Sequence, residues 1–417
     1  MHTGKDGRPQ RTDAGAPAER AATAASSAEP SYPAPATSPA PASTPLWAPP
    51  AAPEPPKRAR SGGLWIAVIG IVLVGVVALF VIGYLLVALG APGVLVATLL
   101  AFVPLTLVLL TIRWIDRWEP EPRWALWFAF LWGGAVSVAV ALLVDAGLRF
   151  ALATPAESDT WGEFLSAVVQ APLIEELAKG IGVLLILLFW RTHFDGPVDG
   201  LVYAATVAAG FAFSENIVYF AVALAEGGTA DLGYTFVVRG IFSPFAHVMF
   251  TAATGIALGM AARRGRGILP AFLLGLLIAV ALHALWNGAL FLVEDVIGYY
   301  VFVQVPLFVF AIVTTVGIRR QEVRLTRERL QEYANAGWYA DSEVVMLATP
   351  AGRRRARAWA KGAKPPRTRE MRAFIADSTH LAFTRQRLVT GRARATDLAD
   401  ERALLASVTA TRARLMG

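Results

Sequence analysis

The stretch APLIEELAKGIG, residues 171–182, places two carboxylates and one ammonium group inside an otherwise apolar segment. Glu175 and Glu176 lie four and three residues before Lys179, so on a helix the lysine can pair with either glutamate. Simple neutralisation of Lys179 by Glu175 would leave Glu176 unexplained. Ionisable groups within a membrane-spanning helix are costly and mark functional sites. The three residues are therefore candidates for a site that handles water inside a membrane.

Three more apolar segments carry polar residues at a shared depth. These residues are Glu215 and Asn216 in FAFSENIVYF, His247 in FSPFAHVMFTAATG, and His283 and Asn287 in ALHALWNG. At about 1.5 Å per helical residue, the two histidines and the glutamates Glu176 and Glu215 all fall roughly 16–20 Å below the outer loops. Each residue alone has a structural explanation, such as hydrogen bonding of Glu215 to Asn216 or Tyr219. Their common depth on antiparallel helices predicts one site.

Prolines and glycines modify the same segments. Pro172 and Pro244 each lie three residues before a candidate site residue, and a proline at this depth frees a carbonyl and kinks the helix. Such irregular backbone suits a water-containing cavity better than lipid. Gly255 and Gly259 form a GxxxG pattern, which allows close approach of a neighbouring helix.

The composition is that of a membrane protein. The chain has 417 residues, 55% of them hydrophobic, with a mean hydropathy of +0.51, and the apolar residues concentrate between Leu64 and Ile318. A soluble protein of this composition would expose too much apolar surface, so the excess must face lipid. Because the chain has no cysteine, disulfides, thiol nucleophiles and thiolate metal sites are excluded.

We expect an all-α, polytopic membrane helix bundle of about eight transmembrane helices. Length and hydropathy place them at about 64–88, 92–112, 124–150, 164–190, 200–225, 236–262, 268–293 and 297–318. Arginine and lysine gather in every second loop, whereas the alternate loops are acidic or neutral. This alternation predicts a multi-pass protein of the cell membrane with both termini in the cytoplasm.

The chain divides into three regions by composition. Residues 1–60 are rich in proline and alanine and are predicted to be a disordered tail. Residues 61–320 hold the eight spans, and residues 321–417 form a basic, helical cytoplasmic tail. The tail contains no recognisable nucleic-acid-binding module, so we expect no nucleic-acid partner. Its basic residues favour either a solvated surface or contact with anionic membrane lipid.

The motifs EELAK, GFAFSENIVYF, SPFAHVMFTA and HALWN resemble the PrsW family of intramembrane proteases, which is similar to the CAAX prenyl protease and bacteriocin-processing group. DRWEPEPRW and DGLVYAATVAAGFAF also match, and the resemblance covers roughly residues 64–320. It implies cleavage of a single-pass, membrane-anchored protein such as an anti-sigma factor. It also implies that the four catalytic residues are Glu175, Glu176, His247 and His283, with Asn287 supporting them. The equivalent of Glu215 is less clearly assigned, because the wider group commonly has a histidine-bearing FxxxH motif there.

Our hypothesis is an intramembrane endopeptidase in which Glu176 is the general base and Glu175 assists while paired with Lys179. The histidines hold water and stabilise the tetrahedral intermediate, and the supporting residues are Lys179, Glu215, Asn216 and Asn287. Glu176, His247 and His283 could instead bind a divalent metal such as zinc, although the chain has no HExxH motif. The alternatives are a proton-coupled transporter, since buried Glu, Lys and His also form proton relays, and an inactive binding scaffold.

Overall fold

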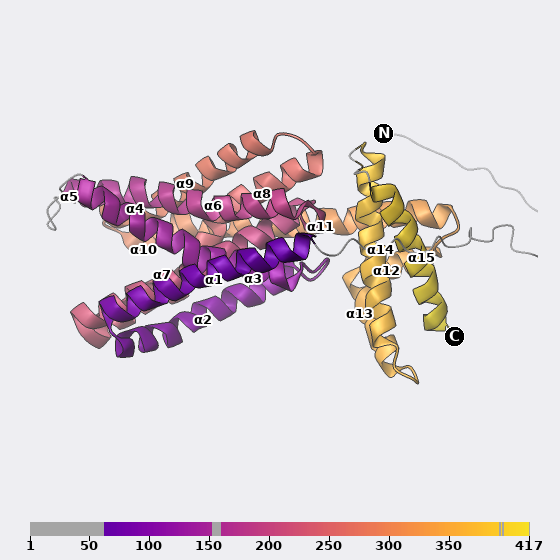
Figure 1. The fold of residues 1–417 in the computed structure, drawn as a ribbon, viewed down its shortest axis with the longest axis horizontal. Coiled ribbons are helices and arrows are strands. Elements are labelled where there is room, and N and C mark those ends of the chain that lie inside the picture. Colours follow the sequence, from indigo (N-terminus) through magenta and orange to yellow (C-terminus); the bar gives the residue numbers. More distant parts are fainter. Residues whose placement is uncertain (1–61, 152–159, 392, 394–395, 417) are drawn as a thin grey trace, which may run out of the picture. The chain divides into compact units, whose positions relative to one another are not determined.

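The computed structural model describes residues 62–151, 160–391, 393 and 396–416, and the described chain is helical without strands. The long helices between residues 62 and 292 run roughly alongside one another (Figure 1). In chain order the elements are α1 (Gly62–Leu89), α2 (Ala91–Ile115), α3 (Arg123–Leu131), η1 (Trp132–Ser137), α4 (Val138–Ala151), α5 (Thr160–Leu165), η2 (Ser166–Gln170), α6 (Ala171–Phe189), η3 (Arg191–His193), α7 (Pro197–Phe236), η4 (Val237–Phe242), α8 (Ala246–Arg264), α9 (Ile268–Leu292), α10 (Val296–Tyr299), η5 (Tyr300–Gln304), α11 (Val305–Asn335), α12 (Asp341–Leu347), α13 (Pro350–Gly362), α14 (Thr368–Val389) and α15 (Asp397–Met416). The predicted disordered tail, 1–60, lies outside the described residues.

The polytopic helical bundle is confirmed. Six helical ranges of the described chain are long and apolar enough to cross a membrane: Ile69–Leu89, Ala91–Ile115, Arg123–Ala151, Pro197–Arg264, Ile268–Ala289 and Ile297–Asn335. The range Pro197–Arg264 covers two predicted spans, 200–225 and 236–262. The backbone leaves helical geometry between them, at Gly228, where φ is 69°. The predicted span 164–190 is not among the six, since α6 carries three ionisable residues. The number of eight spans therefore stays a prediction.

Helix α7 is the centre of the bundle. Every residue from Gly196 to Phe211 is buried, so this part of the helix is surrounded on all sides. Its sequence, PVDGLVYAATVAAGF, is rich in alanine and glycine, and small residues allow neighbouring backbones to approach closely. A Cβ on Gly133 of η1 would lie 1.8 Å from the carbonyl oxygen of Val207, which shows how tight this contact is.

The GxxxG pattern lies at the contact between α8 and α7. A Cβ on Gly255 would lie 2.1 Å from the Gly200 carbonyl oxygen, and one on Gly259 would lie 2.3 Å from that of Gly196. Neither glycine has room for a side chain. The close approach that the pattern allows is therefore present, and it brings α8, with His247, against α7.

The region after the last predicted span folds around a hydrophobic core of its own. Leu330 and Tyr333, near the end of α11, pack in this core with residues of α12–α15, so α11 continues unbroken through the predicted boundary at 320. Arg353 of α13 is buried and donates hydrogen bonds to the carbonyl oxygen of Trp118 (2.8 Å) and to Thr379 Oγ1 (2.7 Å). The tail is thus tied to the loop between α2 and α3.

Gly255→Ala should lower the free energy of unfolding by about 1–3 kcal/mol, because the added methyl group overpacks the α7–α8 contact. The measurement is a denaturant titration of the purified chain in detergent micelles. Gly75→Ala is the matched control, since a Cβ there meets nothing within 4 Å. Equal destabilisation by the two substitutions would show that the α7–α8 contact is not tight.

Candidate functional site

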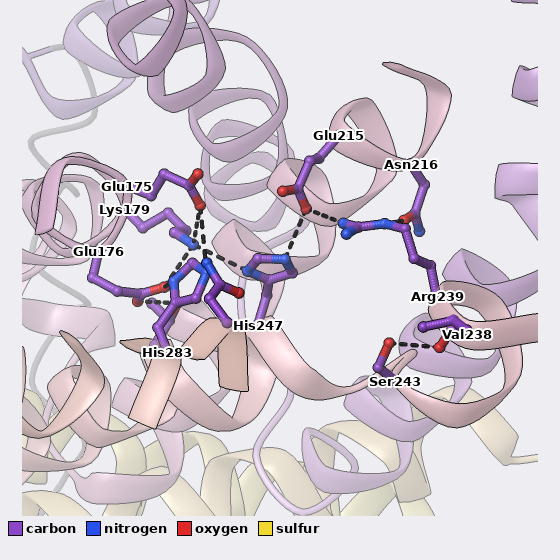
Figure 2. Close-up of polar contacts among 12 residues, drawn as sticks. Glu175, Glu176, Lys179, Glu215, Asn216, Val238, Arg239, Ser243, His247 and His283 are labelled. Atoms are coloured by element: carbon purple, nitrogen blue, oxygen red, sulfur yellow. Dashed lines mark hydrogen bonds and ion pairs between the residues drawn. The ribbon is translucent and has the colours of Figure 1, made fainter. Parts of the chain in front are cut away.

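The charged residues of α6 form a buried ion-pair group. Glu176 and Lys179 are fully buried, and Lys179 Nζ lies 2.6 Å from Glu176 Oε1 (Figure 2). The same ammonium lies 3.6 Å from Glu175 Oε2 and 4.0 Å from the ring centre of Phe211. As the spacing of the three residues on a helix predicts, Lys179 faces both glutamates.

Both carboxylate oxygens of Glu176 have partners on other helices. Thr251 of α8 donates its hydroxyl hydrogen to Oε2 at 2.8 Å, and Nδ1 of His283 on α9 lies 3.2 Å from Oε1. Because a carboxylate only accepts, His283 carries its proton on Nδ1 and presents the lone pair of Nε2. Glu176 thus joins α6 to α8 and α9 and sets the tautomer of His283.

Glu175 has an oxygen that takes part in a long ion pair but in no hydrogen bond. Its Oε2 is buried and has no hydrogen-bond partner among the described residues. The nearest cationic or ring nitrogen atoms are Lys179 Nζ at 3.6 Å and His283 Nε2 at 3.9 Å. A buried carboxylate oxygen without a partner costs stability, so it indicates a place where another group binds.

His247 is held between Lys179 and a second acidic residue. Lys179 Nζ lies 3.3 Å from His247 Nδ1, and since an ammonium only donates, Nδ1 carries the lone pair. His247 Nε2 then donates to Glu215 Oε2 at 2.8 Å. Glu215 is in turn paired with Arg239 of η4, whose Nε donates to Asn216 Oδ1 at 2.9 Å (Figure 2).

A break in the helix precedes His247. The chain leaves helical structure at Ser243 and Pro244, and α8 begins at Ala246. Ser243 closes the break by donating from its backbone nitrogen (3.0 Å) and hydroxyl (2.8 Å) to the carbonyl oxygen of Val238. His247 is therefore in the first turn of α8, where the positive end of the helix dipole favours nearby carboxylates. This break follows from the proline that the sequence places at membrane depth.

The donor atoms fit a divalent metal. Glu175, His247 and His283 each offer a ligand atom, and these atoms lie within 4.8 Å of one another. Two imidazoles and a carboxylate are a ligand set that zinc accepts. The charges also fit: the site contains three carboxylates and two basic side chains, so a further cation reduces the repulsion among the carboxylates. The carboxylates are those of Glu175, Glu176 and Glu215, and the basic side chains are those of Lys179 and Arg239.

This set differs from the predicted one in its carboxylate. The sequence predicts Glu176 as the metal ligand, whereas the geometry groups Glu175 with the two histidines. The reason is that both carboxylate oxygens of Glu176 already have partners: Oε1 contacts Lys179 and His283, and Oε2 accepts from Thr251. Adjacent residues point about 100° apart on a helix, which is why the sequence leaves their roles open.

The predicted supporting residues fall into different places. Asn216 contacts the site through Arg239, as described above. Asn287 donates to the carbonyl oxygen of Ala167 at 2.7 Å, which fastens α9 to η2, the turn that leads into α6. Sequence reasoning missed Arg239 and Thr251. Two signals could have found them: an arginine near the start of the apolar stretch 236–262, and a threonine one helical turn after His247.

The arrangement suits hydrolysis at membrane depth. The two ring nitrogens with lone pairs are His283 Nε2, which lies 3.9 Å from Glu175 Oε2, and His247 Nδ1, which accepts from Lys179. The other two ring nitrogens are held by carboxylates. Carboxylate partners of this kind orient imidazole ligands and raise their basicity. Such a preorganised set can bind a cation and act on water.

Comparison with known proteins shows clear relatives. A family model described as PrsW family intramembrane metalloprotease matches residues 121–311, which contain every residue of the site. Protease PrsW of Geobacillus kaustophilus is 30% identical over 188 residues, 44% of this chain and 75% of the relative. That of Oceanobacillus iheyensis is 29% identical over 181 residues, 43% of this chain and 77% of the relative. That of Clostridioides difficile is 32% identical over 158 residues, 38% and 62% of the two chains. No solved structure matches.

Glu215→Gln should weaken zinc binding about 10–100-fold, because the residue orients His247 and pairs with Arg239. The measurement is competition of the purified chain with a chromophoric zinc chelator. Glu226→Gln is the control, since Glu226 lies on the same helix but is exposed. Equal zinc affinities of the two variants would show that Glu215 does not contribute to zinc binding.

Proposed function

This chain belongs to the PrsW family of intramembrane proteases, and from that premise we propose how its buried site works and what it cleaves. The protein is a membrane protease. We propose that Glu175, His247 and His283 hold a zinc ion. The observation that carries this proposal is that ligand atoms of Glu175, His247 and His283 lie within 4.8 Å of one another, and that the carboxylate oxygen among them has no hydrogen-bond partner. The ion would replace Lys179 as the partner of His247 Nδ1. Bound there, zinc would act as a Lewis acid and lower the pKa of water.

The other polar residues keep these three in place. Glu176 fixes the tautomer of His283 and pairs with the Lys179 ammonium. Glu215, which is paired with Arg239, fixes the tautomer of His247. We therefore propose Glu176 as a positioning residue rather than the general base that the sequence predicts. Lys179 supplies a fixed positive charge, which keeps two adjacent carboxylates tolerable without water around them.

We propose that the substrate is a single-pass, membrane-anchored protein of the anti-sigma-factor kind, cut within or near its transmembrane helix. The site is buried among helices that are apolar enough to cross a membrane, so a substrate that itself lies in the membrane reaches it most directly. A peptide bond in a regular helix is shielded by its backbone hydrogen bonds, so the substrate must unwind locally before cleavage. Proteins with short or interrupted transmembrane helices meet this requirement at the lowest cost.

Glu175→Gln and Glu176→Gln should affect zinc and cleavage differently. Glu175→Gln removes a ligand, so both bound zinc and cleavage should be lost. Glu176→Gln leaves the three ligands in place, so the chain should retain zinc with about 10–100-fold lower affinity and cleave slowly. Zinc content is measured on purified chains by elemental mass spectrometry. Cleavage is measured by mapping new protein N-termini in membranes of cells that express each variant.

Glu226→Gln serves as the control for both measurements. A single-pass protein cut in cells with the parent or the control, but not with Glu175→Gln, identifies the substrate. Full zinc content and unchanged cleavage in Glu175→Gln would exclude it as a ligand. If Glu176→Gln lost zinc and Glu175→Gln kept it, the set that the sequence predicts would be the correct one.

We propose that the protein lies in the cell membrane with both termini in the cytoplasm, because arginine and lysine gather in every second loop. The absence of cysteine allows a direct test with single substitutions. In intact cells, a membrane-impermeant maleimide should label Glu226→Cys, in an exposed part of the turn near Gly228, but not Ser342→Cys in the tail. Ser342→Cys should react after permeabilisation. The reverse labelling pattern would invert the topology.

A further inference from the structure

A cavity lies at the other end of the helices that carry the site. It has a volume of about 430 Å³ and is bounded by the end of α6, the turn between α8 and α9, and the end of α14. Among its lining residues five guanidinium groups accompany one carboxylate, that of Asp195. The five arginines are Arg191, Arg263, Arg264, Arg266 and Arg387. The cavity is therefore strongly cationic.

Two of these arginines are committed to the protein. Arg387 donates to Asp195 at 2.7 Å and to Asp397 at 3.0 Å, and it holds α14 against the loop before α7. Arg263 lies 3.5 Å from Glu322 of α11. These pairs stabilise the lining of the cavity, and the carboxylate of Asp195 is already paired with Arg387.

Arg264 and Arg266 are in a different situation. Both are exposed, and within the described parts of the chain neither has a carboxylate within the 4.0 Å of an ion pair. Gly265, with φ 68°, and Gly267, with φ 74°, form the tight turn that carries them. The left-handed conformation at these positions favours glycine, so the sequence RRGRG shapes the turn and supplies its charge at once.

The cavity is also lined by apolar residues and by the polar Gln386 and Thr390 of the tail. Leu187 is near the end of α6, Ile268 begins α9, and Phe383 comes from α14. A cationic cavity at the ends of apolar helices matches a phosphate group, such as the one in the headgroup of an anionic lipid. Arg264 follows His247 by 17 residues of helix α8, roughly 25 Å at 1.5 Å per residue, so the cavity is separate from the zinc-binding residues.

We propose that this cavity binds a phosphate-bearing anion through Arg264 and Arg266, supplied either by the headgroup of an anionic membrane lipid or by a soluble phosphate. Guanidinium groups bind phosphate oxygens in a bidentate way, and two on one short turn can hold one phosphate together. Because residues of α14 line the cavity, the anion also touches the tail, and its binding joins the tail to the membrane helices.

The test uses the full chain in phosphatidylcholine nanodiscs and two probes. Phosphatidylglycerol is added to the nanodiscs, and the lipid that stays bound after release into detergent is counted by native mass spectrometry. Inorganic phosphate is titrated calorimetrically into lipid discs without phosphatidylglycerol. The variants are Arg264→Gln/Arg266→Gln and Arg264→Lys/Arg266→Lys. The control of equal charge is Arg354→Gln/Arg369→Gln, whose residues are exposed on the tail and do not line the cavity.

We expect the parent chain to retain phosphatidylglycerol in preference to phosphatidylcholine. The glutamine pair should weaken this binding about tenfold or more, and the tail control should keep it. The lysine pair should give an intermediate loss, because lysine keeps the charge but not the bidentate geometry. Loss of phosphatidylglycerol binding alone identifies the lipid as the source, and loss of phosphate binding alone identifies a soluble ligand. If the parent bound neither probe, or the glutamine pair and the tail control bound equally, the proposal would be overturned. Both readouts are independent of proteolysis.

Discussion

A charged group inside a membrane must find its counter-charge within the protein, and this constraint governs the structure around Lys179. Its ammonium lies between Glu175, Glu176 and His247 and over the ring of Phe211. Removal of one partner from a buried pair leaves an uncompensated charge, at a cost of about 3–5 kcal/mol. The polar residues of α6, α7, α8 and α9 are therefore interdependent. The unsatisfied oxygen of Glu175 is the exception, and it is where the chemistry is expected.

Such interdependence requires that the helices meet closely, and α7 provides the means. Its buried half is so rich in alanine and glycine that η1 and α8 pack backbone against backbone on it. Larger residues would hold the helices further apart, and His247 would then lie too far from Lys179 for contact. The small residues of α7 are thus as necessary to the site as the ionisable ones, although they carry no chemistry themselves.

Much of this arrangement could be predicted from the sequence, because depth in a membrane can be counted along a helix. Hydropathy predicts the bundle, and the common depth of Glu176, Glu215 and the histidines predicts that they meet. Rotation about a helix cannot be counted in the same way, so the sequence could not say which glutamate faces the histidines. Arg239 escaped notice because its partner Glu215 is reached only through the reversal of the chain near Gly228. Side-chain partners depend on such tertiary folding.

The unbroken helix α11 has a mechanical consequence. It extends for 31 residues, about 46 Å, from the hydrophobic core of the tail to η5. There the hydroxyl of Tyr300 donates to the carbonyl oxygen of Phe242 at 2.8 Å, next to the break that precedes His247. A continuous helix resists bending, so α11 is a stiff connection between the hydrophobic core of the tail and the backbone that leads into His247 of the protease site.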